Sequence, residues 1–306
     1  MASSSVCDLE SASRWLCDQI SNTENGWSAG KIGTSELNAL IFYIKRCNSQ
    51  LKTPYPQYIV KEMTQNAGFW NEPSKTMDEA LDSWAEALIE AIKNINTIVI
   101  WNPLTKIEEL QIINHYAPAT KKIVLRALEP YYSPNNQYTL QMTKGPIAVV
   151  SPFADSIQKQ WSNRHNIFPK EGLAGQMWLP NQVLIAIKAP YGPALTQNTS
   201  LGWPEHILNK GHKEAVKYLA DQVVQSGAKY AFVGIGALSL LLVNELKKQS
   251  ITAIHTGGGT QIMFGIKGNR WLNHSIISRF FNTSWIKPSN DETPSGAQQV
   301  EKSCYW

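Results

Sequence analysis

Cysteine is scarce in this sequence: a chain of 306 residues holds Cys7, Cys17, Cys47 and Cys304. None of them forms a C-x-x-C pair, and four are too few for a disulfide-stapled scaffold. Other catalytic and metal signatures are also missing. The six histidines show neither an H-E-x-x-H motif nor i, i+4 pairing, and the chain contains no P-loop and no G-x-S-x-G. Common zinc sites and the α/β-hydrolase type of nucleophile are therefore excluded.

Charge of one sign and long apolar runs are lacking too. The net charge is only +4 and no dense Lys/Arg block occurs, so a nucleic-acid partner is not expected. The longest apolar run, 230–243, contains two glycines and is too short to cross a bilayer. The N-terminus has early acidic residues and no apolar core, unlike a signal peptide. We expect a soluble, cytoplasmic protein without a transmembrane segment, and the sequence leaves a homo-oligomer open.

The chain does contain a regular alternation of short apolar runs with helical patterns. Apolar runs such as 97–101, 146–153 and 229–236 are buried-strand patterns, and amphipathic stretches such as 78–93 separate them. This rhythm predicts an α/β protein with a Rossmann-like, doubly wound, mostly parallel sheet and helices on both faces. The expected organisation is an N-terminal helix in 1–27, a catalytic region in 28–282 and a C-terminal tail in 283–306 that packs back on the fold. The catalytic region can divide into two lobes, near 28–140 and 141–282.

Several local features carry more specific predictions. Thr34, Ser35 and Glu36 are expected to cap the helix that follows the first strand, and Asp155 is expected to cap a later helix. Residues 203–227 are expected to form one long helical stretch with a glycine at its end. Residues 121–132 are expected to form a strand that leads into a proline-rich loop.

Ligands of open parallel sheets bind beyond the carboxyl ends of the strands. This rule selects the residues where each predicted strand ends. They are Gly33–Glu36, Glu129–Tyr132, Ser151–Phe153, Ala189–Tyr191, Gly234–Gly236 and His255–Thr260.

Two glycine motifs lie at these strand ends. The pair Gly234 and Gly236 lacks the third glycine of the dinucleotide fingerprint, so tight helix packing competes with NAD binding as its explanation. The run Gly257–Gly259 offers exposed backbone amides for an anion, with Lys267 and Arg270 following at a distance suited to a diphosphate. The alternative for this run is a flexible loop with solvated charges.

The segment "GKIGTSEL" resembles the "R-F-G-D-G-E" opening of the GT-D type glycosyltransferases, a Rossmann-like family. The later order of "SPF", "VLIAIKAP", "AFVGIGALS" and "ITAIHTGGG" is also similar, and the resemblance covers most of 28–268. The tail resembles the ending of uncharacterised proteins, viral ones included, found near glycan-building genes. The family's Asp and Glu serve the metal and the nucleotide sugar. Here Gly33 and Glu36 match that pattern, but Thr34 replaces the Asp.

The resemblance implies a glycosyltransferase that moves a sugar from a nucleotide sugar, first of all a UDP-sugar, to a glycan or glycoprotein acceptor. Threonine binds Mn²⁺ or Mg²⁺ poorly compared with a carboxylate, so a metal requirement is put in question, and Glu36 would be its one ligand. Glu36 or Glu129 would be the catalytic base, and Trp285 or Tyr305 would close over the site. Residues expected to contact the donor are Gly33, Thr34, Ser151, Phe153, Gly234, Gly236, His255, Thr256, Gly257, Gly258, Gly259, Lys267 and Arg270.

Two rival functions remain from the residues alone. One is a different nucleotide-dependent enzyme on the same kind of sheet, such as an oxidoreductase or a nucleoside-processing enzyme. The other is a non-catalytic binding or scaffold protein on a degenerate glycosyltransferase-like fold, which the Thr34 substitution motivates. In that case Glu36 only caps its helix.

Overall fold

A parallel β-sheet organises the molecule, and the computed structural model describes it through residues 6–49, 53–196 and 200–306. Within these ranges, seven strands pair in the order β3-β2-β1-β7-β6-β4-β5, and every pairing is parallel. The strands are β1 (Ser28–Lys31), β2 (Thr97–Val99), β3 (Lys121–Ile123), β4 (Ile147–Ser151), β5 (Leu184–Lys188), β6 (Tyr230–Val233) and β7 (Thr252–His255). The predicted Rossmann-like α/β fold is confirmed.

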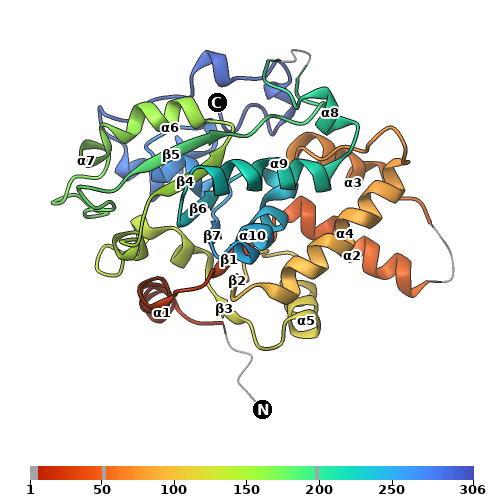
Figure 1. Ribbon diagram of the computed structural model, residues 1–306, viewed down its shortest axis with the longest axis horizontal. Coiled ribbons are helices and arrows are strands. Elements are labelled where there is room, and N and C mark those ends of the chain that lie inside the picture. The colour runs from red at the N-terminus through yellow and green to blue at the C-terminus, as the bar shows by residue number, and fades with distance from the viewer. Residues whose placement is uncertain (1–5, 50–52, 197–199) are drawn as a thin grey trace.

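Helices cover both faces of this sheet (Figure 1). One face carries α2 (Thr34–Asn48), α3 (Gln57–Lys61), α4 (Met77–Asn94), α5 (Lys106–Tyr116), α8 (Glu205–Leu208), α9 (His212–Gln225) and α10 (Ser239–Lys248). The other face carries α1 (Leu9–Asn22), α6 (Ala154–Trp161), α7 (Arg164–Ile167) and α11 (Gly259–Met263). A π-helical turn, η1, spans Glu62–Asn66. Short 3₁₀ turns span Leu125–Leu128, Pro130–Tyr132, Tyr138–Gln141, Gly236–Leu238, Asn269–Trp271, Ile277–Phe280, Asn290–Glu292 and Ala297–Gln299.

The protein has two hydrophobic cores because successive side chains of each strand point to opposite faces of the sheet. In β4, Ala148 and Val150 face the core with α9 and α10, whereas Ile147 and Val149 face the opposite core. Strands that are apolar on both sides need cover on both sides, which is why the sequence reads as continuous apolar runs. None of the helices in the described ranges has the length and apolar character needed to cross a bilayer.

Local predictions were wrong at four places. Residues 203–227 form two helices, because Gly211 takes a φ of 76° between α8 and α9. The strand at 121–132 ends at Ile123, after which 3₁₀ turns follow. Helix α2 has Gly33 as its N-cap, with no side-chain cap from Thr34 or Ser35. Asp155 does not cap α6; it is exposed and its carboxylate pairs with Lys188.

The C-terminal tail, 283–306, folds back over the face that carries α6. Trp285, Val300 and Trp306 are buried in its core. Glu292 is fully buried, and its carboxylate accepts hydrogen bonds from the backbone N–H groups of Asp155 (2.8 Å) and Ser156 (3.1 Å). The tail therefore supplies the cap that α6 lacks in its own sequence.

Candidate functional site

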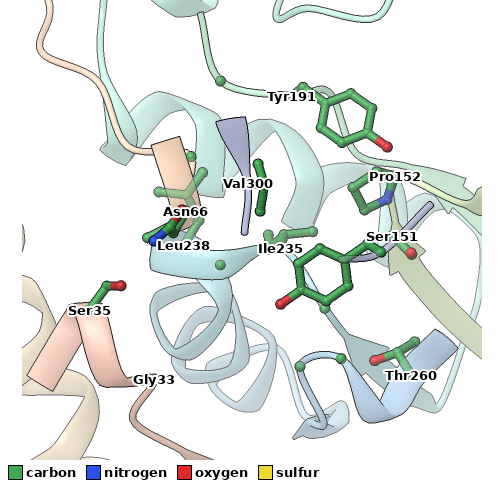
Figure 2. Close-up of a pocket in the computed structure, with 18 of the residues that line it drawn as sticks. Gly33, Ser35, Asn66, Ser151, Pro152, Tyr191, Ile235, Leu238, Thr260 and Val300 are labelled. Atoms are coloured by element: carbon green, nitrogen blue, oxygen red, sulfur yellow. The ribbon is translucent and has the colours of Figure 1, made fainter. Parts of the chain in front are cut away.

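A pocket of about 250 Å³ opens at the carboxyl edge of the sheet. Figure 2 shows its labelled walls, with Ser35 and Asn66 on one side and Tyr191 and Pro152 on the other. Every strand except β3 contributes at or just after its last residue. The contributions are Lys31 from β1, Trp101 after β2, Ser151 from β4, Pro190 after β5, Gly234 after β6 and His255 from β7.

Sheet topology explains why a hollow forms there. The chain leaves β1 toward β2 and β3 on one side, whereas β7, β6 and β4 lie on the other side of β1. Loops that leave adjacent strands in opposite directions create a crevice, the usual ligand position in doubly wound folds. The pocket lies at this switch point between β1 and β7.

Lys31 brings a partly buried cation into the pocket. Its Nζ lies 4.2 Å from the centroid of the Trp101 ring, and no carboxylate of the described residues approaches it within 4.0 Å. Burial lowers the pKa of Lys31, while the more distant charges of Glu129 and Glu36 act in the opposite direction. An ammonium in this setting is suited to an anionic ligand.

Glu36 lies in the first turn of α2 and its carboxylate folds back over Gly33. A Cβ at Gly33 would lie 2.1 Å from Glu36 Oε2, so only glycine leaves room for this arrangement. Burial raises the pKa of Glu36, and its own backbone N–H and Lys31 oppose that shift. A carboxyl group with a raised pKa in a pocket is a candidate general base.

Arg270 supplies a second cation from the opposite side of the glycine loop. Its Nη1 donates to Tyr305 Oη at 3.1 Å, and its guanidinium carbon lies 4.8 Å from the centroid of the Tyr305 ring. Its Nη2 pairs with the carboxylate of Glu301. Nearby Tyr305 and Glu301 raise the pKa of Arg270 against the effect of burial, so the guanidinium stays charged.

The glycine loop separates the two cations. A Cβ at Gly257 would lie 3.2 Å from Lys31 Nζ, and a Cβ at Gly258 would lie 3.8 Å from Arg270 Nη1. Because consecutive Cα atoms are about 3.8 Å apart, Lys31 and Arg270 flank one dipeptide. Gly257 has a φ of 55°, which a residue with a side chain rarely adopts.

His255 stays neutral at the floor of the pocket. Its Nδ1 lies 3.0 Å from the carbonyl oxygen of Val233, an arrangement that favours the proton on Nδ1. Burial, reinforced by the charge of Lys31, lowers the pKa of His255 to about 3. The ring is therefore available as a hydrogen-bond acceptor through Nε2 rather than as a cation.

The residues around Glu36 do not fit the metal site that the resemblance implies. Thr34 Oγ1 donates to Asn102 Oδ1 at 2.9 Å, and the described residues hold no group of three acids, cysteines or histidines that could ligate a metal ion. Two charged side chains act on the pKa of Glu36: Lys31 lowers it and Glu62 raises it.

The structure brings most of the candidate site residues together. Those on the pocket wall are Gly33, Thr34, Glu36, Ser151, Phe153, Gly234, Gly236, His255, Gly257, Gly258 and Arg270. The remaining candidates Thr256, Gly259, Glu129 and Lys267 are not part of the wall. Glu129 is buried behind the glycine loop, where Arg126 pairs with it at 2.7 Å. The ammonium of Lys267 lies 5.5 Å from the ring centroid of Phe281, and Trp285 is buried in the core.

Sequence reasoning missed several wall residues, above all Lys31, Trp101 and Glu301. Lys31 had a usable signal, because a lysine that ends a strand of small buried residues must place its charge at the ligand edge. Trp101 had one too, because it ends the apolar run 97–101. Glu301 had none, since its position depends on how distant segments meet. Of the two tail residues that were expected to close over the site, Tyr305 lines the pocket and Trp285 does not.

Comparison with protein-family models, with curated proteins and with solved structures gives no match to this chain.

Proposed function

We propose that this protein is a glycosyltransferase that binds a nucleotide sugar in the pocket at the β1–β7 switch point. One observation carries the proposal: Lys31 and Arg270 flank Gly257 and Gly258 in the same pocket as Glu36. Two cations beside the backbone of a glycine dipeptide are suited to a diphosphate, and a partly buried carboxylate is suited to a base. The GT-D resemblance of "GKIGTSEL" points the same way.

The reaction requires few groups. The oxygen of an acceptor hydroxyl bonds to the anomeric carbon of the donor as the bond from that carbon to the diphosphate oxygen breaks. Glu36 accepts the hydroxyl proton, and the nucleoside diphosphate leaves with the bonding electron pair. Lys31 and Arg270 stabilise the charge that develops on the leaving group, a role for preorganised cations in a pocket. No step assigned to these residues passes through a metal ion.

The aromatic half of the pocket supports a donor with a flat or sugar ring. Tyr191, Trp203 and Trp306 line the wall, and Trp306 packs against Phe153 and Tyr191, which follow β4 and β5. Aromatic faces stack on bases and on the apolar faces of sugars. A donor that places its diphosphate between the cations would direct one of its rings toward these side chains.

The test is a thermal-shift screen of nucleoside diphosphates and nucleotide sugars, each with and without Mn²⁺. A ligand at about 100 times its Kd stabilises the native state by about 2.7 kcal/mol, which raises Tm by several degrees. We expect such a shift for one nucleotide family, without a requirement for Mn²⁺. No shift from any compound, in a protein that melts cooperatively, would overturn the proposal.

A matched pair of lysine variants connects the shift to this pocket. Lys31 and Lys188 both end a strand, but only Lys31 lines the pocket. Lys31→Met should abolish the ligand-induced shift, and Lys188→Met should preserve it. Equal effects of both substitutions would place binding elsewhere.

A further inference from the structure

A left-handed turn lies at the rim of the pocket in the tail. Glu301, Lys302 and Ser303 have φ values of 43°, 57° and 60°. Among the other described residues that are not glycine, only Ser250 has a positive φ. Side chains disfavour this conformation, so three such residues in succession need compensating contacts that hold them.

Contacts with the 269–270 segment hold this turn. The backbone N–H of Arg270 donates to the carbonyl of Cys304 at 2.9 Å, and Asn269 Nδ2 donates to the carbonyl of Ser303 at 3.1 Å. At the other end, the Glu301 carboxylate pairs with Arg270 Nη2, and Glu301 itself lines the pocket. Among the described residues, this ion pair is the side-chain contact that connects the strained turn to a cation on the pocket wall.

The two cations of the pocket differ in their partners. Lys31 has no acid within 4.0 Å among the described residues, whereas Arg270 has Glu301. The side chain of Glu301 is 54% exposed and that of Arg270 is 29% exposed, so this pair is solvated and can exchange for another anion.

We propose that Glu301 occupies Arg270 only while the pocket is empty, and that a ligand with two adjacent phosphates displaces it by bridging Lys31 and Arg270. The hydrogen bonds to the carbonyls of Ser303 and Cys304 keep the turn at 301–303 in place, so the side chain of Glu301 is the part that moves. This inference rests on the proposed function for the identity of the ligand, a nucleoside diphosphate or its sugar ester. It adds a self-inhibitory contact: a built-in carboxylate that competes with the ligand's phosphate.

Calorimetric titration of the whole protein with UDP and with inorganic pyrophosphate at low salt tests the competition. Glu301→Gln removes the competing charge and should lower the Kd for both ligands by about threefold or more, the size expected for an exposed ion pair. Asp291→Asn is the control, because Asp291 is exposed on the same tail and is not on the pocket wall. It makes the same charge change and should leave both Kd values as they are.

The lower Kd of Glu301→Gln should depend on Arg270. In an Arg270→Met background, Glu301→Gln should no longer tighten binding, because the contact that it frees is already lost. A gain that persists without Arg270 would overturn the displacement.

The outcomes separate this inference from the proposed function. If wild-type protein binds UDP but Glu301→Gln has the same Kd, the self-inhibitory contact is wrong and the proposed function stands. If pyrophosphate binds with the predicted gain and no nucleotide binds, the contact is right and the proposed function is wrong. If neither ligand binds, both are wrong.

Discussion

Two strand-to-helix turns meet at the same edge of the sheet, and each brings a carboxylate to the start of a helix. After β1, Glu36 of α2 folds back over Gly33 from within its own helix. After β4, the carboxylate at the start of α6 comes from Glu292, far along the chain in the tail. The chemistry at the two helix ends is similar, but the surroundings are not.

The difference separates a structural carboxylate from a candidate base. Glu292 is fully buried and accepts hydrogen bonds from two backbone N–H groups and from the Ser156 hydroxyl. Glu36 faces the pocket, has a raised pKa, and forms no hydrogen bond to another residue within the described part of the chain. A carboxylate that is saturated with donors stabilises the fold, whereas one with free lone pairs can accept a proton from a substrate.

Substitution of Glu36 should have the largest effect of the changes considered. Glu36→Gln keeps the shape of the side chain and removes the base, so we expect sugar transfer to fall by about 10²–10⁴-fold. Donor binding should remain and Tm should not fall, because a carboxyl group that burial disfavours is replaced by a neutral amide. Initial rates, donor Kd and Tm of the variant provide the three measurements.

Glu129→Gln is the matched control, since Glu129 was an equal candidate for the base in the sequence. It is buried behind the glycine loop and paired with Arg126. Its replacement should lower stability more than it lowers the rate measured on folded protein. A rate loss in Glu129→Gln as large as that in Glu36→Gln would contradict the assignment.

Substitution of Glu292 should lower the stability of the fold. Glu292→Ala leaves two buried N–H groups and a hydroxyl without their acceptor, and we expect a loss of about 2–3 kcal/mol in the free energy of unfolding. Asp291→Ala, one residue away and exposed, should change it by less than about 0.5 kcal/mol. Urea unfolding of both variants measures the difference, and similar values for the two would show that the tail cap is not needed.

The pH dependence of stability tests whether the pKa of Glu36 is raised in the folded protein. Because the pKa of Glu36 is raised in the folded state above its ordinary value of 4.5, the folded protein binds this proton more tightly than the unfolded chain does. The stability from this group is complete at pH values below 4.5 and is lost as pH rises through the raised pKa. The Tm of Glu36→Gln minus that of the wild-type protein should therefore increase with pH across this window. A difference that is flat or decreases with pH would contradict the raised pKa.

The fold was predictable because it depends on patterns that each segment carries itself. Continuous apolar runs such as 146–153 require cover on both faces, and the rule for strand ends placed Gly33, Ser151 and His255 at one edge. Those three residues do lie on a common pocket.

Features that depend on distant partners were not predictable. Nothing in the first turn of α6 indicates that a glutamate of the tail will cap it, so Asp155 was the natural expectation there. Glu301 likewise enters the pocket only because the tail meets the loop that carries Arg270. Local sequence indicates where a carboxylate is needed, but it does not indicate which residue provides it.

Asp155 offers the smallest and most discriminating prediction. Removing a true N-cap would cost about 1 kcal/mol, whereas an exposed ion pair contributes about 0.5 kcal/mol or less. Asp155 and Lys188 are 67% and 43% exposed, at 3.0 Å from each other, so Asp155→Ala should lower the free energy of unfolding by no more than the ion-pair value. The residual effect should vanish in a Lys188→Ala background and at high salt, because Glu292 continues to hold the start of α6. A loss near 1 kcal/mol that persists in both conditions would instead show that Asp155 shares the capping of α6, and the division between the two helix starts would be less sharp than the hydrogen bonds of Glu292 indicate.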